Sequence, residues 1–290
     1  MFDPLLKSIS RERPVLIAGP TASGKSALAM DLAARDGRVI VNADALQVYH
    51  CWRVLTARPS LADEAQYPHA LYGHVPCDGT YSVGHWLREV AAWLDRPVVI
   101  VGGTGLYFMA LTDGLAEIPS IPTAIRATAD ALRRDDPARM AAMLDADTAA
   151  RIDLANPARV QRAWEVLQTT GRGLAAWQAE TPAPSVPLDK AEAIVLRPAV
   201  DWLNDRIDRR FDAMMSNGAL EEVRAVLPTW APEHPSARAI GAPELVSHLR
   251  GDISLGDAID AAKLASRQYA KRQRTWFRNR MKSWRGITLP

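Results

Sequence analysis

The residues best suited to chemistry form a glycine-rich loop near the start of the chain. They follow the pattern G-x-x-x-x-G-K-[ST] that is typical of ATP-binding and other nucleotide-binding loops: Gly19, Pro20, Thr21, Ala22, Ser23, Gly24, Lys25 and Ser26. In such a loop backbone N–H groups surround phosphate oxygens, the lysine reaches the terminal phosphates and the last hydroxyl can hold Mg²⁺. An apolar run precedes the loop at 15–18 and a helical pattern follows at 26–33, so the sequence predicts a di- or triphosphate site.

Two further polar segments follow predicted strands. Asp44 comes after the apolar run 38–42, and the Gly-Gly-Thr-Gly segment 102–105 follows the next such run. Because ligands of parallel sheets bind beyond the carboxyl ends of the strands, we expect both segments to meet the phosphate loop. Gln47 and Tyr49 offer an amide for an adenine edge and a ring on which a base can stack. This context favours Asp44 as a general base for a nucleobase nitrogen over a turn or N-cap residue.

The strand at 97–101 argues against ordinary ATP chemistry. A P-loop ATPase or kinase places a magnesium-binding aspartate at the end of such a strand, whereas this one ends in Gly-Gly-Thr. Thr104 can instead offer a hydroxyl to phosphate or metal, and its glycine neighbours permit close backbone approach.

The elements that must position these residues alternate between strand and helix. Apolar runs at 15–18, 38–42, 97–101 and 193–196 predict buried parallel strands, and 83–94 has a helical pattern. We therefore expect an α/β fold with a P-loop NTPase-like core, in which helices flank a parallel sheet. The predicted division is residues 1–116 for the first part of the core, a helical insertion at 117–190 that ends in a proline-rich return, and residues 191–290 for the rest of the core and basic helices. From 201 onward the pattern is nearly all helical, broken at 228–235 and 241–243.

The last thirty residues are strongly basic. No Asp or Glu follows Asp260, aromatic residues are interleaved, and the cations are Lys263, Arg267, Lys271, Arg272, Arg274, Arg278, Arg280, Lys282 and Arg285. On one helix they would cover more than one face, which favours contact with a nucleic-acid backbone over a solvated amphipathic helix. A second cluster, Arg206, Arg209 and Arg210, offers an arginine for pyrophosphate, with surface ion pairing as the alternative.

Composition adds bounds on location. The chain has 290 residues, a formal charge of +2 and two cysteines, from which we expect no disulfide framework and a reducing cytosol. No signal-peptide pattern and no apolar run near 20 residues occurs, so we expect a cytoplasmic protein without a membrane partner. The histidines and cysteines lack metal-ligand spacing.

Four motifs in order resemble the tRNA dimethylallyltransferase family across nearly the whole chain. They are GPTASGKS at 19–26, ADALQVY at 43–49, GGTGLY at 102–107 and RQYAKRQRTWFR at 267–278. The resemblance implies transfer of a dimethylallyl group from dimethylallyl diphosphate to N6 of the adenosine 3′ of the anticodon in tRNA, with Mg²⁺ as cofactor. The partners are then the anticodon stem-loop and the diphosphate, and we expect a monomer.

The same resemblance assigns residue roles. It implies that residues 19–26 hold the pyrophosphate, with Ser26 on the metal, and that Asp44, Thr104 and Arg210 are catalytic. The implied tRNA contacts are Asp44, Ala45, Leu46, Gln47, Arg126, Ala158, Arg159, Val160, Gln161, Arg162, Lys271, Arg274 and Arg278. The chain departs from the family's usual residues at Ala45, at 55–59, at Ala158 and at Ala242.

Three other functions compete with this one. An adenylate prenyltransferase would use the same crevice but leaves the basic tail without a role. A kinase predicts ATP consumption and a carboxylate-held metal. A non-catalytic RNA-binding protein would use the loop as a switch and would not need Asp44.

Overall fold

The computed structural model describes residues 3–290, which divide into two compact units. The first combines the described residues up to Thr112 with Val186–Pro290, and the second is Asp113–Ser185. The chain leaves the first unit and returns to it at neighbouring positions: the Val186 N–H donates a hydrogen bond to the Leu111 carbonyl at 3.0 Å.

The first unit is built on a six-stranded sheet in the order β3-β2-β4-β1-β5-β6, with every strand pair parallel. The strands are β1 (Val15–Ala18), β2 (Val39–Asn42), β3 (His69–Ala70), β4 (Val98–Gly102), β5 (Glu192–Pro198) and β6 (Arg285–Leu289). The predicted α/β core and its four strands are confirmed. Two edge strands were missed because β3 has two residues and β6 carries an exposed arginine and a glycine in place of an apolar run.

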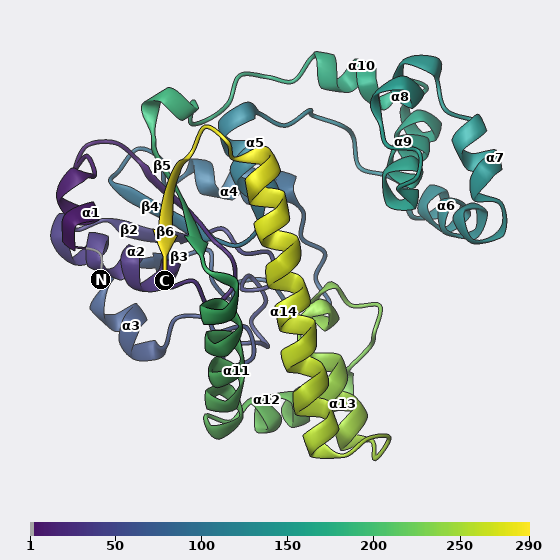
Figure 1. The fold of residues 1–290 in the computed structure, drawn as a ribbon. Coiled ribbons are helices and arrows are strands. Elements are labelled where there is room, and N and C mark those ends of the chain that lie inside the picture. Colours follow the sequence, from purple (N-terminus) through teal and green to yellow (C-terminus); the bar gives the residue numbers. More distant parts are fainter. Residues whose placement is uncertain (1–2) are drawn as a thin grey trace. The chain divides into compact units, whose positions relative to one another are not determined.

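Helices cover both faces of this sheet (Figure 1). On one face α2 (Lys25–Asp36) packs Leu28 and Leu32 against strand residues such as Ile17 and Val101. On the other face Trp86 of α4 (Val83–Ala91) and Phe108 of α5 (Gly105–Asp113) pack together with the end of the last helix. Apolar side chains therefore alternate between two cores along each strand, which fixes the register of the sheet.

Between Val200 and Arg280 the regular structure is all helical. Its helices are α11 (Val200–Ser216), α12 (Ala219–Val226), α13 (Ala242–Leu249) and α14 (Leu255–Arg280), with short 3₁₀ turns at Leu188–Lys190, Leu227–Thr229 and Pro235–Arg238. In Figure 1 α14 is the long yellow helix beside α11. The break expected at 241–243 is present at Gly241, which precedes α13, whereas Ala242 and Pro243 lie in the first turn of that helix because proline fits there. The nearly all-helical pattern expected from 201 onward did not include the final strand.

Two short helices complete the first unit, α1 (Asp3–Ser8) and α3 (Leu61–Gln66). The second unit contains α6 (Thr123–Asp135), α7 (Pro137–Ala142), α8 (Ala146–Arg151), α9 (Pro157–Thr170) and α10 (Leu174–Ala179). Its small core joins Ala129, Met140, Val160 and Trp164. Asp136, Asp145 and Asn156 each accept a backbone N–H at the start of a helix, so polar side chains separate these short segments.

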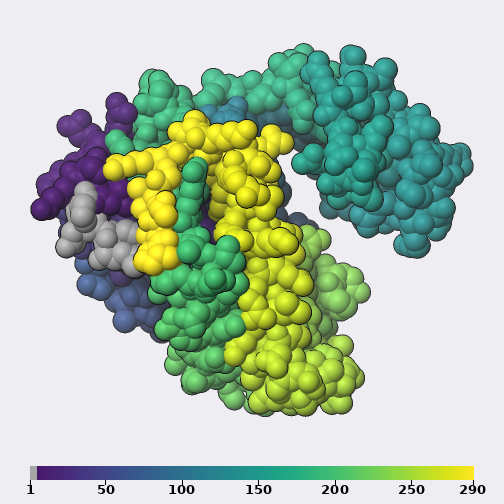
Figure 2. Space-filling model, in the orientation of Figure 1, coloured from purple at the N-terminus to yellow at the C-terminus, as the bar shows by residue number. Residues whose placement is uncertain are grey.

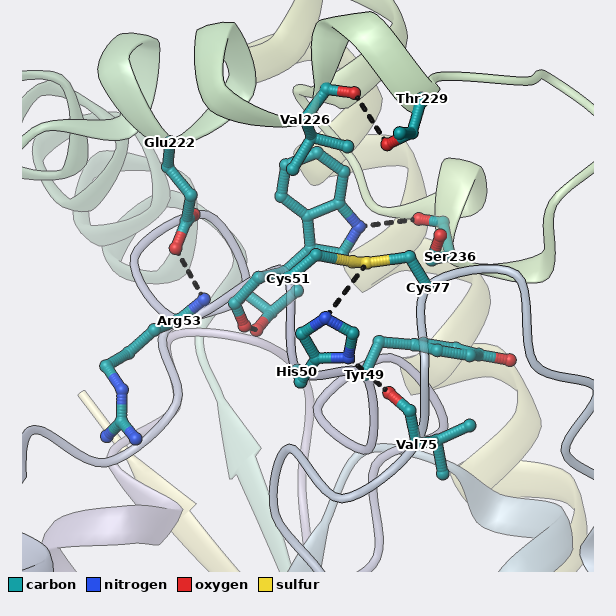
Figure 3. Close-up of a disulfide and its surroundings, with 12 residues drawn as sticks. Tyr49, His50, Cys51, Arg53, Val75, Cys77, Glu222, Val226, Thr229 and Ser236 are labelled. Atoms are coloured by element: carbon teal, nitrogen blue, oxygen red, sulfur yellow. Dashed lines mark hydrogen bonds between the residues drawn. A yellow bond between two sulfur atoms is a disulfide. The ribbon is translucent and has the colours of Figure 1, made fainter.

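The expectation of no disulfide is contradicted. Cys51 and Cys77 are bonded, with their Cα atoms 5.9 Å apart (Figure 3). Backbone hydrogen bonds from Val75 to Val48 and from His50 to Val75 bring the two segments together. The cysteines are 26 positions apart in the sequence, and that spacing did not predict their pairing.

Across residues 3–290, none of the helices combines the length and apolar character needed to cross a membrane.

Trp86 provides a test of this core. Its side chain is fully buried, its Nε1 donates to the Asn42 carbonyl at 2.6 Å, and its ring stacks on Tyr107. We expect Trp86→Phe to lower the free energy of unfolding by about 2–3 kcal/mol, because it leaves that carbonyl unpaired and opens a void. Urea unfolding measures this, and the half-buried Trp93→Phe should cost under about 1 kcal/mol. Equal losses in the two variants would contradict the role assigned to Trp86.

Candidate active site

The predicted phosphate loop joins β1 to α2, and its backbone has the required bends. Gly24 has φ of 88° directly before the first helical residue, Lys25, and Ala22 also has a positive φ of 61°. A positive φ at a non-glycine residue is uncommon and marks a constrained turn. The loop therefore lies at the amino end of a helix, where N–H groups attract an anion.

A cavity opens beside this loop. Its polar lining includes Thr21, Asp44, Arg210 and Tyr269. The rest of its wall is mostly apolar and comes from four parts of the chain: Leu46, Leu55, Ile207, Phe211, Met214 and Ile240. The cavity thus combines charged groups with an alkyl-lined wall, which suits a small amphiphilic ligand.

Two cations and a carboxylate interact around the cavity. Burial lowers the pKa of Lys25 to about 8; the charge of Asp44 opposes this effect and that of Arg210 adds to it. Burial likewise lowers the pKa of Arg210 to about 10, opposed by Asp44 and assisted by Arg206. A bound anion would therefore stabilise the charged forms of both side chains, because it would offset the cost of their desolvation.

Asp44 is held by its own turn and by β2. Its Oδ1 accepts the Leu46 N–H at 3.0 Å, while its backbone exchanges hydrogen bonds with the Asn42 side chain at 2.8 and 3.0 Å. The turn role considered from sequence is thus real for one oxygen. Within residues 3–290 no hydrogen bond reaches Oδ2, which lies toward Gly103: a Cβ on that glycine would come within 3.2 Å of it. One carboxylate oxygen is anchored and the other is available.

The end of β4 contacts the Asp44 segment directly. Thr104 Oγ1 accepts the Ala45 N–H at 2.9 Å, and the Thr104 N–H donates to the Ala43 carbonyl at 3.1 Å. A Cβ at Gly102 would lie 2.0 Å from that same carbonyl. Gly102 is therefore required by close packing of backbone on backbone, whereas a Cβ on Gly103 would meet the side chains of Gln273 and Asp44.

Helix α11 supports the phosphate loop. The Arg210 Nη2 donates to Thr21 Oγ1, and the Arg206 Nε donates to the Ala22 carbonyl at 3.0 Å while its guanidinium stacks on Trp202. Arg209 instead pairs with Asp205 on the surface. Of the three arginines, two contact the loop and one does not.

The structure places Ala45, Leu46 and Gln47 beside the cavity in different roles. Leu46 lines it, whereas the Gln47 Nε2 donates to the carbonyls of Thr56 and Ala57 at 2.8 and 3.0 Å. The amide donors of Gln47 are therefore used within the protein, and a ligand meeting this side chain finds only its carbonyl oxygen.

In the second unit the predicted RNA contacts separate into exposed and buried residues. Arg126, Ala158, Arg159 and Arg162 are exposed at the surface. Partial burial of its guanidinium is the main cause that lowers the pKa of Arg162, and the nearby charge of Arg126 lowers it further. Val160 and Gln161 are buried, and the Gln161 Nε2 donates to Asp130 and Glu165. Those two side chains serve the core of the unit.

The basic residues of α14 also divide. Lys263 and Arg267 form ion pairs with Asp212 and Asp208 of α11. Lys271, Arg274 and Arg278 are spaced i, i+3 and i+7, which places them on one side of the helix. Figure 2 shows α14 as a continuous exposed yellow surface beside α11.

Sequence reasoning missed the apolar wall and one polar residue, Gln273. Phe211, Met214 and Ile240 carry no chemical signal of their own, and only the packing of α11 and the 239–241 turn brings them together. Gln273 is buried on α14 between the loops after β1 and β4. The sequence did contain one signal for it: Gln273 is a polar residue at a position where the helical period of the basic helix predicts a buried side chain.

The groups present are compatible with Mg²⁺. Within the described chain no cluster of three or more His, Cys, Asp or Glu side chains can hold a metal by itself. Mg²⁺ commonly binds through one or two protein oxygens together with waters and substrate phosphates. The Ser26 hydroxyl on the first turn of α2 is the protein oxygen suited to that arrangement.

A parallel sheet with a phosphate-type loop, a charged crevice and an apolar pocket defines a group-transfer enzyme with a P-loop-like α/β fold. The family described as IPP transferase matches residues 47–280, and the one described as isopentenyl transferase matches residues 13–69. A tRNA dimethylallyltransferase of Cereibacter sphaeroides (strain KD131) is 69% identical over 99% of this chain and 92% of its own. The chain belongs to the IPP transferase family and is a prenyltransferase.

Solved structures agree on the architecture. A tRNA isopentenylpyrophosphate transferase from Bacillus halodurans is similar with a TM-score of 0.68 and 30% identity, over 96% of this chain and 90% of that one. A eukaryotic dimethylallyltransferase acting on tRNA has a TM-score of 0.80 at 24% identity, over 96% of this chain and 74% of that one. At that identity the second likeness bears on the fold alone.

The lowered pKa of Lys25 predicts how diphosphate binding depends on pH. Because the free protein loses this proton above about pH 8, we expect the Kd of inorganic diphosphate to rise by up to about tenfold per pH unit beyond that point. Calorimetry on the wild-type protein and on Lys25→Arg measures it. The arginine variant keeps its charge, and the ionisation of diphosphate itself is common to both proteins. Identical profiles would contradict the assignment.

Proposed function

We propose that this protein transfers a dimethylallyl group from dimethylallyl diphosphate to N6 of the adenosine 3′-adjacent to the anticodon in tRNA, which gives N6-(dimethylallyl)adenosine and diphosphate. One observation carries the proposal: a single cavity brings together Thr21 of the phosphate loop, Arg210, Asp44 and an apolar wall. The printed names of the relatives support the same substrates.

The cavity matches the two ends of the donor. Its diphosphate lies on the loop beside Lys25 and Arg210, both of which burial has deprived of water. Its five-carbon chain lies against the apolar wall, to which Phe211 and Met214 contribute. Burial of an alkyl chain and neutralisation of a buried cation are both favourable, so the pocket selects a short alkyl diphosphate.

The chemistry requires a base. The N6 amine of adenine is a weak nucleophile because its lone pair is delocalised into the ring. As the new N6–C1 bond forms and the C1–O bond to diphosphate breaks, Asp44 accepts the proton that leaves N6. Its anchored Oδ1 fixes the carboxylate and its open Oδ2 faces Gly103, near Thr104. Asp44 is thereby held by the backbone around it.

The leaving group gains negative charge as the C1–O bond breaks. Loop N–H groups, Lys25 and Arg210 stabilise that charge. Mg²⁺ held by Ser26, and by phosphate oxygens, supplies further charge neutralisation when it is bound. Because the attack is at carbon and not at phosphorus, an aspartate at the end of β4 is unnecessary, and Thr104 occupies that place.

The RNA must present its base outside the stack. Unstacking costs least for a base already in a loop, which favours an anticodon loop as the substrate. Lys271, Arg274 and Arg278 on α14 are suited to phosphate contact by their shared side of the helix. In the second unit the exposed Arg126, Arg159 and Arg162 offer a separate cationic surface, whereas the buried Gln161 serves the core of that unit.

Transfer of label tests the function. The protein is incubated with labelled dimethylallyl diphosphate and Mg²⁺, and with unmodified anticodon stem-loop RNA or AMP in parallel. We expect label only on the RNA, at the adenosine beside the anticodon. Label on AMP would support an adenylate prenyltransferase instead, and ATP hydrolysis without label transfer would support a kinase-like enzyme.

Asp44→Asn isolates the base. The amide keeps an acceptor for the Leu46 N–H but cannot take a proton from N6, so we expect the single-turnover rate to fall about 10²- to 10⁴-fold. Binding of the stem-loop RNA should stay within about twofold of wild type. Asp78→Asn, at an exposed site, is the matched control and should retain activity. A loss of RNA binding in proportion to the loss of rate would refute the general-base role.

Lys271→Gln tests the RNA surface of α14. Removing one phosphate contact should weaken binding and reduce the slope of log K against log salt by about 1. Arg224→Gln, on the exposed side of α12, should change neither quantity. An unchanged slope for Lys271→Gln would place the RNA elsewhere.

A further inference from the structure

Gln273 lies where three parts of the candidate site meet. It is 6% exposed, on the side of α14 that also buries Ala270 and Phe277. Its Oε1 accepts the Thr21 N–H of the phosphate loop at 2.9 Å, and its Nε2 donates to the Gly103 carbonyl at 3.0 Å. Burial raises the pKa of the Tyr269 phenol, and a hydrogen bond with Gln273 partly opposes that rise.

These contacts connect Gln273 to both reacting ends of the cavity. Thr21 is the residue whose hydroxyl accepts from Arg210, so the link reaches the diphosphate side. Gly103 precedes Thr104, whose hydroxyl accepts the N–H that follows Asp44, so the link also reaches the base. A Cβ on Gly103 would lie 2.3 Å from Gln273 Nε2 and 3.2 Å from Asp44 Oδ2, which shows how closely the two side chains approach one glycine.

The chemistry of a primary amide fits this place. One end of the link requires an acceptor and the other requires a donor, and only Asn and Gln carry both on one short planar group. Buried N–H and C=O groups without partners are costly, so the amide also satisfies the loops it joins. The Thr21 N–H is consequently unavailable to phosphate, and the later amides of the loop must serve that purpose.

We propose that Gln273 is a positioning residue for the transfer reaction: it holds the phosphate loop and the Asp44–Thr104 pair at a fixed separation across the ends of β1 and β4. This inference rests on the proposed function. It makes α14 a helix with two roles, because its exposed side carries the RNA-facing cations and its buried side sets the geometry of the reacting groups. A group displaced by about 1 Å can lower a rate about 10²-fold, since reacting atoms must be aligned.

The test compares variants of similar size in the full-length protein. Gln273→Met keeps the length and removes both hydrogen bonds, while Gln273→Glu keeps the acceptor for Thr21 and places a carboxylate against the Gly103 carbonyl. Ala258→Gly, on the buried side of the same helix, lowers stability without touching the link. Melting temperature, Kd for stem-loop RNA and single-turnover rate from dimethylallyl diphosphate are measured for all four proteins, at a temperature where each is folded.

For Gln273→Met and Gln273→Glu we expect the rate at saturating substrates to fall at least about tenfold, with RNA Kd within about twofold of wild type. Ala258→Gly should keep its rate. A wild-type rate in Gln273→Met, an equal loss in Ala258→Gly, or a proportional loss of RNA affinity would overturn the positioning role alone. Absence of any transfer by the wild-type protein would overturn the proposed function and this inference with it.

Discussion

The structure depends on holding two cations, Lys25 and Arg210, away from water beside a single carboxylate. Burial disfavours both charges, and Asp44 only partly offsets that effect. Neutral contacts keep the three charges in place: the Pro20 carbonyl accepts from Lys25, the Thr21 hydroxyl accepts from Arg210, and the Leu46 N–H donates to Asp44. Under the proposed function, an incoming diphosphate relieves this excess positive charge. Binding and placement of the leaving group are thereby one event.

The chemistry-bearing residues were predictable from sequence because their signals are local. A phosphate loop requires glycines and a lysine in fixed order, and an aspartate at a strand end is located by the strand itself. Parallel topology then brought Asp44, Thr104 and the loop together, as the rule for strand ends implies. The family resemblance added Arg210, whose contact with Thr21 spans 189 positions in the sequence.

The remainder depended on contacts between distant segments. Leu55, Phe211 and Ile240 look like ordinary core residues until α11 and the two loops fold around one cavity. Gln47 was expected to face RNA from its type and from the resemblance, and Gln161 from the resemblance, yet each donates its amide hydrogens to partners inside the protein. The disulfide follows from backbone hydrogen bonds between residues 48–50 and residue 75, and no periodic pattern in the sequence predicts these contacts. Side-chain type predicts what a residue can do, and tertiary contacts decide which partner it finds.

The helical unit 113–185 enters and leaves the first unit at adjacent positions, joined by the hydrogen bond between Leu111 and Val186. An insertion whose two ends are adjacent costs the sheet little stability, because the entropic cost of closing a loop rises only slowly with its length. The sheet and its crevice are therefore free to persist while the inserted unit is enlarged, shortened or exchanged. In evolutionary terms, this attachment allows the inserted unit to diversify while the sheet and its crevice stay constant.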